Sequence, residues 1–239
     1  MKTDVIAVIS ARYGSTRFPG KALALLKGKP MVEWVWRKVT SAKKINRVIV
    51  ATDDRRIADV IERAGGEAKM TSKDHPSGTD RTAEAVRGLE AAWILNVQGD
   101  EPMIEGWALD EFVEKLGQTE MATLARKIEE TGAENDPNVV KVVTDAQGCA
   151  LYFSRAAIPF RRDAGAAAVD YWHHLGIYAY RPATLQKFVS LPPSRLEQIE
   201  KLEQLRALEN GIEIQVIRTT LKVIGVDTPE DLKRVEQLI

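Results

Sequence analysis

Short apolar runs alternate with helical patterns along most of this chain, and this alternation restricts the fold more than any other feature of the sequence. Residues 5–9 and 48–51 have the composition of buried strands. Between them Val32, Val35 and Val39 recur at helical spacing, which predicts an amphipathic helix of about three turns. The alternation is typical of a layered α/β fold, in which right-handed crossovers place helices on the faces of a sheet.

The same alternation continues into the middle of the chain. Residues 57–61 have the spacing of a second helix, and residues 93–97 have the composition of a further strand. That strand ends at the polar segment 98–102, whose glycine and proline stop regular structure there. We therefore expect polar side chains at the carboxyl end of a buried strand.

The second half of the chain has a different pattern. Three strand candidates follow one another without a helix between them, at 139–143, 150–153 and 175–180. They predict an antiparallel excursion from the main sheet. The small residues of 163–168 predict a mobile loop, because they offer little apolar area to offset the entropy of ordering; a short exposed helix is the alternative. Leucine and isoleucine spacing over 196–208 predicts one long helix, and Thr228 before Pro229 predicts the cap of a final helix.

Composition limits both the domain count and the class of partner. The chain has 239 residues and is 44% hydrophobic, which is enough for one substantial core, so we expect a single domain over residues 1–239. The 34 basic and 34 acidic side chains cancel, so no global field draws the protein to nucleic acid or an anionic membrane. Cys149 is the only cysteine, which excludes an internal disulfide. The apolar stretch 5–9 is too short for a signal peptide or a membrane span, so we expect a cytoplasmic protein.

A loop of eleven residues after the first strand combines glycines, hydroxyls and three cations. It runs from Ala11 to Lys21. Such a loop suits a polyphosphate, because glycines permit close backbone approach while amides and cations bind phosphate oxygens. It has neither the Walker A spacing nor the G-x-G-x-x-G spacing. The alternative is a solvated basic turn, and the three cations favour phosphate binding.

Two further polar segments carry candidate ligands. Residues 77–81 precede a helical pattern, which would place their amides and hydroxyls at a helix N-terminus; an ordinary capped turn is the alternative. Asp100 follows a strand, where open α/β sheets place their ligands. A carboxylate beside a triphosphate requires a cation, and Mg²⁺ commonly takes one or two carboxylates plus phosphate oxygens. Asp227 is a candidate second ligand, or else a favourable charge at the start of the final helix.

Motifs distributed over the whole chain resemble those of the 3-deoxy-manno-octulosonate (Kdo) cytidylyltransferases, in the order of that family. They are ARYGSTR at 11–17, MTS at 70–72, SGTDR at 77–81, NVQGDEP at 96–102, ALYFSR at 150–155, HLGIY at 174–178, LEQLR at 202–206 and GVDTP at 225–229. The resemblance implies a Rossmann-like nucleotidyltransferase fold with a mixed central sheet. It also implies Mg²⁺-dependent transfer of CMP from CTP to Kdo for lipopolysaccharide biosynthesis. A homodimer joined through a strand-rich, sugar-binding subregion at about 139–182 is expected as well.

Carried over residue by residue, the resemblance implies three groups of side chains. The nucleotide ligands are Ala11, Arg12, Gly14, Ser15, Arg17, Lys21, Ser77, Gly78, Thr79, Arg81 and Gln98. The acid-sugar pocket consists of Arg155, Arg162, His174, Tyr178, Glu203 and Gln204. The metal ligands are Asp100 and Asp227, which share the catalytic role with Arg12 and Lys21.

Two departures and several alternatives stay open at this stage. Ser10 stands where the family usually has proline, which restores a backbone N–H and is expected to loosen that turn. Arg161 lies beside Arg162, so either arginine is a candidate for the sugar. The alternative functions are a cytidylyltransferase for 8-amino-Kdo or a sialic acid, a sugar-1-phosphate nucleotidylyltransferase, and a catalytically silent nucleotide-binding regulator. The number of metal ions, one or two, is also open.

Overall fold

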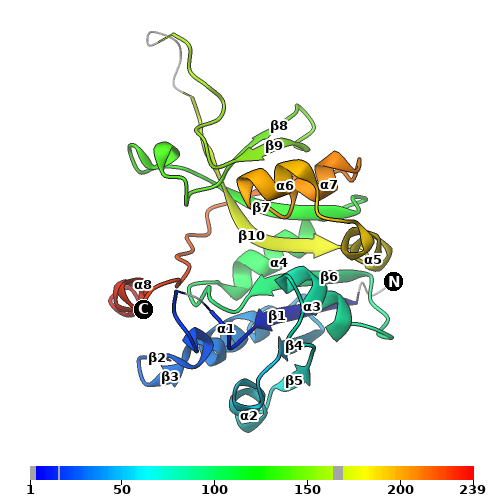
Figure 1. Ribbon diagram of the computed structural model, residues 1–239, viewed down its shortest axis with the longest axis vertical. Coiled ribbons are helices and arrows are strands. Elements are labelled where there is room, and N and C mark those ends of the chain that lie inside the picture. The colour runs from blue at the N-terminus through cyan, green and yellow to red at the C-terminus, as the bar shows by residue number, and fades with distance from the viewer. Residues whose placement is uncertain (1–3, 16, 164–168) are drawn as a thin grey trace.

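The computed structural model describes residues 4–15, 17–163 and 169–239, and Figure 1 shows their arrangement as helices around a twisted sheet. The main path of the sheet runs in the order β5–β4–β1–β6–β10–β7–β11. Its strands are β1 (Val5–Ala11), β4 (Arg47–Thr52), β5 (Glu67–Met70), β6 (Trp93–Gln98), β7 (Met121–Lys127), β10 (Trp172–Tyr180) and β11 (Gln215–Thr219). β10 is antiparallel to both of its neighbours, while the other pairs in this path are parallel, so the sheet is mixed.

Two smaller strand pairs flank this path. β8 (Lys141–Thr144) and β9 (Ala150–Ser154) form an antiparallel hairpin, which is attached to the first residues of β10. β2 (Leu25–Leu26) and β3 (Lys29–Pro30) form a separate two-stranded sheet.

Helices cover both faces of the sheet because its strands are apolar on both faces. Val5, Ala7 and Ile9 belong to one core cluster, and Ile6 and Val8 belong to the other, as the period of two in a strand requires. The first cluster includes residues of α1 (Met31–Thr40), α2 (Arg55–Arg63) and α4 (Gly106–Glu114). The second is covered by α3 (Gly78–Ala85), α5 (Pro182–Ser190), α6 (Arg195–Glu200) and α7 (Leu205–Glu209). The result is a three-layer arrangement, which confirms the predicted layered α/β fold.

Three short elements complete the chain. They are η1 (Lys21–Leu23), η2 (Ala133–Asn135) and α8 (Pro229–Glu236). α8 has the predicted cap, since Thr228 Oγ1 accepts a hydrogen bond from the Asp231 amide at 3.2 Å. Its Val235 packs with Leu26 and Met31, so the end of the chain lies against the segment that follows the first loop. This packing brings Asp227 back to the amino-terminal loop.

Two predictions differ from the structure. The strand candidate 175–180 is part of β10, which lies inside the main sheet between β6 and β7 and not in an excursion; β8 and β9 alone form the hairpin outside it. The predicted long helix over 196–208 is wrong. Lys201 has a φ of 55°, a left-handed conformation that ends α6, and Ile199 is 66% exposed. The turn between α6 and α7 carries Glu203 and Gln204.

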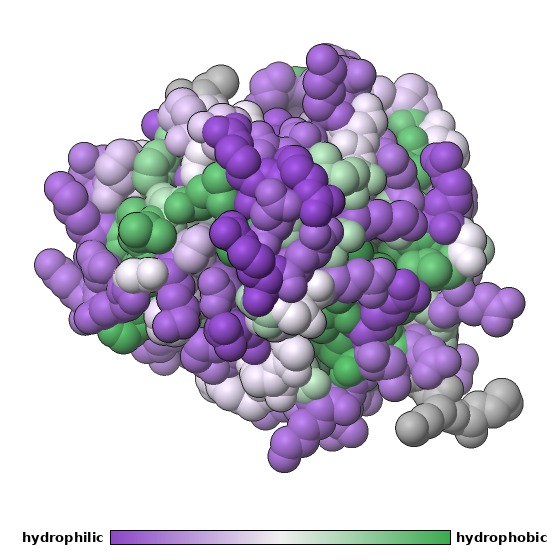
Figure 2. Space-filling model, turned by 90° about the horizontal axis from the view of Figure 1, so that it is seen from below, coloured by the Kyte–Doolittle hydropathy of each residue, from purple (hydrophilic) through white to green (hydrophobic). Residues whose placement is uncertain are grey.

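The face seen from below is mostly hydrophilic, with hydrophobic residues in separate patches (Figure 2). In the part of the chain that the structure describes, no helix has both the length and the apolar character needed to cross a bilayer. Residues 164–168 of the predicted mobile loop lie outside the described residues.

Candidate active site

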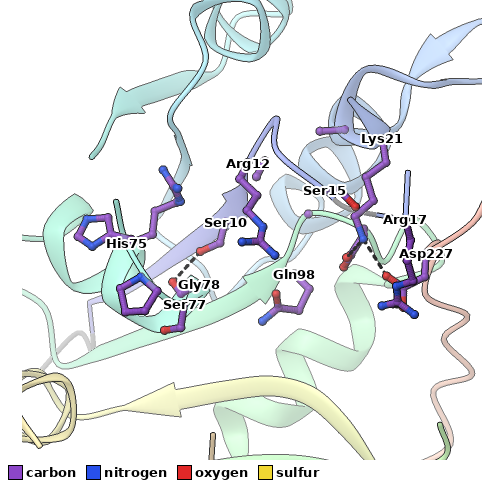
Figure 3. Close-up of a pocket in the computed structure, with 16 residues that line it drawn as sticks. Ser10, Arg12, Ser15, Arg17, Lys21, His75, Ser77, Gly78, Gln98 and Asp227 are labelled. Carbon is purple, nitrogen blue, oxygen red and sulfur yellow. Dashed lines mark hydrogen bonds and ion pairs between the residues drawn. The ribbon is translucent and has the colours of Figure 1, made fainter. Parts of the chain in front are cut away.

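A first cavity lies at the carboxyl ends of β1 and β6, beside the N-terminus of α3. It brings together eleven of the predicted residues, namely Ala11, Arg12, Ser15, Arg17, Lys21, Ser77, Gly78, Arg81, Gln98, Asp100 and Asp227. Figure 3 shows the Arg12 side chain directed into this space toward Gln98, with Lys21 beside Asp227. Arg12 is exposed and makes no hydrogen bond or ion pair with any described residue. It is therefore available to a ligand.

The first loop is held in place by a carboxylate from the end of β4. Asp53 Oδ1 accepts a hydrogen bond from the Tyr13 amide at 3.0 Å, and its Oδ2 accepts one from Arg81 Nη2 at 3.3 Å. Gly20 closes the loop with a φ of +71°, and its amide donates to the Tyr13 carbonyl at 3.0 Å. Arg81 is only 3% exposed, so it both lines the cavity and fixes the loop that carries the cations.

The start of α3 forms the opposite wall. Ser77 Oγ accepts hydrogen bonds from the amides of Thr79 at 3.1 Å and Asp80 at 3.2 Å, which caps the helix. Ser10 Oγ donates to the Gly78 carbonyl at 2.9 Å. This hydroxyl joins the end of β1 to the start of α3, and the looser turn expected from the loss of proline stays a prediction.

Two predicted nucleotide ligands, Gly14 and Thr79, do not line this cavity. Gly14 is exposed in the loop. Thr79 is 2% exposed, and its Oγ1 donates to Glu203 Oε2 at 2.7 Å and accepts from Asn96 Nδ2 at 3.2 Å. Thr79 therefore positions Glu203.

Lys21 lies between the two predicted metal ligands. Its Nζ is 2.5 Å from Asp100 Oδ2 and 3.0 Å from Asp227 Oδ1, and it also donates to the Val226 carbonyl at 3.1 Å. Burial alone would lower the pKa of Lys21, but the charges and hydrogen bonds of the two carboxylates outweigh burial and raise it. Arg17 Nη2 contacts the other oxygen of Asp227 at 2.9 Å. These ion pairs hold together residues that are 79 or more positions apart in the chain.

These two carboxylates fit a magnesium ion. Both converge on one point, which a cation occupies already in the form of the Lys21 ammonium. The described residues contain no cluster of three or more His, Cys, Asp or Glu side chains suited to a metal. A Mg²⁺ ion here would therefore complete its shell with phosphate oxygens and water, as is usual for this ion.

A second cavity adjoins the first, and the two share Arg17, Gln98 and Asp227. It runs along β10 and is bounded by the turn between α6 and α7. Four predicted acid-sugar residues line it, namely His174, Tyr178, Glu203 and Gln204. Neither Arg155 nor Arg162 lines either cavity.

Several polar atoms of residues in the second cavity lack hydrogen-bond partners. Six side-chain polar atoms in the described residues are buried without a hydrogen bond, and five belong to residues that line this cavity. Those five are Glu101 Oε2, Arg126 Nε, His173 Nδ1, Glu203 Oε1 and Gln204 Nε2. Buried polar groups are almost always hydrogen-bonded in native proteins. The cavity therefore has the chemistry of a site for a ligand with many hydroxyl groups.

Sequence reasoning missed three of these five residues. Glu101 follows Asp100 in the NVQGDEP motif, so the motif contained the signal. Burial, followed by the charge of Asp100, raises the pKa of Glu101 to about 8. Arg126 and His173 belong to none of the motifs, and their positions follow only from the pairing of β7 with β10.

Two residues in the central wall of the second cavity, His174 and Tyr178, are uncharged at neutral pH. His174 is 8% exposed, its Nε2 lies 3.1 Å from Thr123 Oγ1, and burial lowers its pKa to about 3. Tyr178 contacts the His174 ring, with centroids 5.4 Å apart, and burial raises the pKa of its hydroxyl. Burial also raises the pKa of Glu203, although hydrogen bonds to hydroxyls oppose this effect. Hydrogen bonding, more than net charge, would recognise a ligand here.

The two predicted sugar arginines have other surroundings. Arg155 Nε donates to the Glu200 carbonyl at 2.7 Å, and its Nη1 donates to the Pro137 carbonyl at 2.8 Å. It therefore ties the end of α6 to the segment before β8. Arg162 is exposed after β9. Their contact with a sugar stays a prediction.

Comparisons with known proteins show which family the chain belongs to. A family model described as cytidylyltransferase matches residues 6–214. A protein of Trichlorobacter lovleyi, named 3-deoxy-manno-octulosonate cytidylyltransferase, is 50% identical over 98% of both chains. A protein of the same name from Thermodesulfovibrio yellowstonii is 50% identical over 98% of this chain and 97% of its own.

A solved structure adds a three-dimensional match. It is a CMP:2-keto-3-deoxy-manno-octonic acid synthetase complexed with CTP, and it is 41% identical with a TM-score of 0.93 over 99% of this chain and 98% of that one. The fold, the motifs and the matched length agree. The chain belongs to the 3-deoxy-manno-octulosonate cytidylyltransferase family.

Proposed function

We propose that this protein transfers CMP from CTP to the anomeric hydroxyl of Kdo, giving CMP-Kdo and pyrophosphate for lipopolysaccharide biosynthesis. The observation that carries the proposal is the meeting of two unlike cavities at Arg17, Gln98 and Asp227. The first has the cations and helix terminus that suit a triphosphate. The second has the unpaired hydrogen-bonding atoms that suit a polyhydroxylated acid. The α-phosphate and the attacking hydroxyl would meet at the junction.

Charge neutralisation is the main work of the first cavity. The acid sugar and the triphosphate are both anionic, and two unit charges about 4 Å apart interact by roughly 4 kcal/mol at an effective dielectric constant near 20. A favourable interaction of that size, made only in the transition state, corresponds to about three decades in rate. Arg12, Arg17 and Lys21 line this cavity and supply that charge. Positioning by the first loop, which Asp53 binds through the Tyr13 amide, and by α3 supplies the rest.

Asp100 and Asp227 would hold Mg²⁺ in this reaction. The ion supplies neutralisation of the charge that develops on the leaving pyrophosphate. The protein's part is to keep the two carboxylates close, which Lys21 does through its contacts at 2.5 and 3.0 Å. Because only two carboxylates converge here, the site favours a metal that arrives with the nucleotide.

The second cavity favours an acid sugar over a sugar-1-phosphate. Glu203 Oε1 has no hydrogen-bond partner, and its nearest cation, Arg206 Nη2, is 3.8 Å away. An unpaired carboxylate accepts hydrogen bonds from hydroxyls and repels a phosphate dianion. Glu101 Oε2 is a second polar atom without a partner in a residue that lines the same cavity, and it is suited to a hydrogen bond with a hydroxyl. Cytidylyl transfer to 8-amino-Kdo or a sialic acid is compatible with this polarity.

We also propose a homodimer that forms through the subregion at about 139–182. Leu151, on β9, is 62% exposed, and Phe160, in the segment that follows β9, is 85% exposed. A second copy would bury these side chains. Light scattering on wild type and Phe160→Ser tests this, with a shift toward the monomer mass expected for the variant. A wild type that is monomeric at micromolar concentration would refute the dimer.

The function itself is tested by measuring pyrophosphate release over a matrix of nucleotides and sugars, with and without Mg²⁺. The acceptors are Kdo, 8-amino-Kdo, a sialic acid and glucose-1-phosphate. We expect release from CTP with Kdo in the presence of Mg²⁺, and none with glucose-1-phosphate. Preference for a sugar phosphate, or no release from CTP with any acid sugar, would overturn the proposal.

A further inference from the structure

Arg126 and His173 face each other at one end of the second cavity. They are directly paired in the antiparallel ladder between β7 and β10, so their side chains share one face of the sheet. Both residues line the cavity. Arg126 Nε and His173 Nδ1 are buried without hydrogen-bond partners. Two paired residues thus each have a buried polar atom that no described residue binds.

Hydrogen bonds hold the two terminal nitrogens of the Arg126 guanidinium. Its Nη2 contacts Glu130 Oε1 at 3.2 Å and Oε2 at 3.3 Å, and its Nη1 donates to the Lys127 carbonyl at 3.5 Å. The side chain is 14% exposed. The contacts on the two terminal nitrogens fix the plane of the group and leave the Nε–H donor for a ligand.

This pair lies far from the place where the two cavities meet. Gly176 marks that junction, since a Cβ built on it would lie 3.9 Å from Gln98 Cγ. His173 precedes Gly176 by three residues on β10, which corresponds to about 10 Å along a strand. The carboxylate of an acid sugar is attached to the reacting anomeric carbon, so it stays near the junction. The group that reaches Arg126 and His173 is the end of the sugar remote from that carbon.

We propose that Arg126 and His173 form a subsite for the terminal hydroxyls of the acid sugar, and that Arg126 makes the enzyme prefer a hydroxyl over an ammonium at the last carbon. This inference rests on the proposed function and assigns the substituent that the motifs leave open. It names two residues outside the set that the family resemblance supplied.

The chemistry of the two atoms supports the assignment. Arg Nε–H is only a donor, so it needs an acceptor such as a hydroxyl oxygen, whereas an ammonium cannot accept a hydrogen bond. The guanidinium charge also repels an ammonium. Burial and the charge of Arg126 lower the pKa of His173 to about 4, so its ring is neutral at neutral pH and forms a hydrogen bond to a hydroxyl without adding charge. Glu130, Asp136 and Lys141 are the other charged groups that act on this ring.

The test compares substrates as well as variants. Wild type, Arg126→Met and His173→Phe are assayed in full-length protein with CTP and either Kdo, its 8-deoxy analogue or 8-amino-Kdo. Lys127→Met is the matched control, because Lys127 is the next residue on the strand, points to the other face and pairs with Asp170 at 2.5 Å. Melting temperatures of all four proteins are recorded.

We expect wild type to use Kdo roughly tenfold better in kcat/KM than the 8-deoxy analogue, because an unmet buried donor is costly. Arg126→Met should lose that preference and gain relative activity with 8-amino-Kdo, while KM for CTP stays the same. His173→Phe should also reduce the preference, and Lys127→Met should keep it.

A purely structural role would reduce activity with Kdo and the 8-deoxy analogue equally, and that result would overturn the subsite. Equal use of Kdo and the 8-deoxy analogue by wild type would also overturn the subsite. That measurement needs no variant, so it tests the proposal even when Arg126→Met does not fold. Absence of CMP transfer to every acid sugar by wild type would instead overturn the proposed function, and the subsite with it.

Discussion

The two cavities differ in whether their polar side chains are paired within the protein. In the first, Lys21 is paired with Asp100 and Asp227, and Arg81 is paired with Asp53, so these charges are balanced within the protein. In the second, five polar atoms are left without partners. Internal pairing keeps a charged site in place before a charged ligand arrives, whereas polar atoms without partners depend on the ligand for their hydrogen bonds. The first should therefore govern rate, and the second should govern choice of sugar.

The largest expected effect comes from the carboxylates of the first cavity. Asp100→Asn keeps the side-chain shape but removes one charge that faces Lys21, and the same applies to Asp227→Asn. We expect turnover to fall by about a thousandfold or more for Asp100→Asn, since one charge pair is worth roughly 4 kcal/mol. Asp227→Asn should be less severe. Near-normal Mg²⁺-dependent rates in both variants, measured by pyrophosphate release, would refute the metal assignment.

The second cavity should respond in KM for the sugar. Glu203→Ala removes an oxygen without a hydrogen-bond partner and the acceptor for Thr79, and Gln204→Ala removes an unpaired donor. An unmet buried hydrogen bond typically costs about 1–3 kcal/mol, so KM for Kdo should rise some ten- to hundredfold. KM for CTP should hardly change. The exposed neighbour Gln198→Ala is the control, and a Glu203 variant that weakens CTP instead of Kdo would break the contrast between the two cavities.

The unequal success of sequence reasoning follows the same contrast. The first cavity is built largely from consecutive residues after β1 and β6, so local composition and spacing predicted most of it. Thr79 is the exception, because helix geometry turns its hydroxyl toward Glu203 and not toward the nucleotide side. Strands and helices with strong periodicity were predicted for the same reason, as β1 and α1 show.

The second cavity depends on pairings that no local pattern encodes. Arg126 and His173 are 47 positions apart, and only the register of β7 with β10 brings them together. The apolar spacing over 196–208 favoured one helix, but Lys201 adopts a left-handed φ of 55° and the turn redirects Glu203. Arg155 has the expected motif, yet its guanidinium donates to backbone carbonyls. A motif fixes the residue type and leaves its direction to tertiary packing.

The cations of the first cavity offer a smaller test of its internal pairing. Arg12 is unpaired and Lys21 is paired with two carboxylates. Their alanine variants should therefore differ in protein stability but show similar losses of activity. We expect Arg12→Ala and Lys21→Ala each to lower kcat/KM for CTP at least roughly tenfold, the loss of one charged hydrogen bond. Neither should lower the melting temperature much, and Lys21→Ala should lower it more. Exposed Lys29→Ala is the control. A large loss of stability with unchanged kinetics would show that the loop is structural.

The smallest expected effect tests whether the wall of the second cavity is neutral. His174 has a pKa of about 3 because burial disfavours its charged form, whereas the unfolded chain has the ordinary value near 6.5. As pH falls below 6.5, His174 takes up a proton in the unfolded state but stays neutral in the folded state. The contribution of His174 to the free energy of unfolding, which is complete above pH 6.5, is therefore lost progressively toward pH 3. Each pH unit lowers the free energy of unfolding by at most about 1.4 kcal/mol, which gives a loss on the order of 1–2 kcal/mol between pH 7.5 and 5. The free energy of unfolding in urea should therefore fall less over this range in His174→Gln than in wild type. Gln198→Ala, which carries no titrating group, should keep the wild-type slope. An unchanged slope in His174→Gln would mean that His174 has the same pKa in the folded and the unfolded protein. Its ring would then take up a proton as pH falls through 6.5, and below that pH the cavity would attract the sugar carboxylate by charge and not by hydrogen bonding alone.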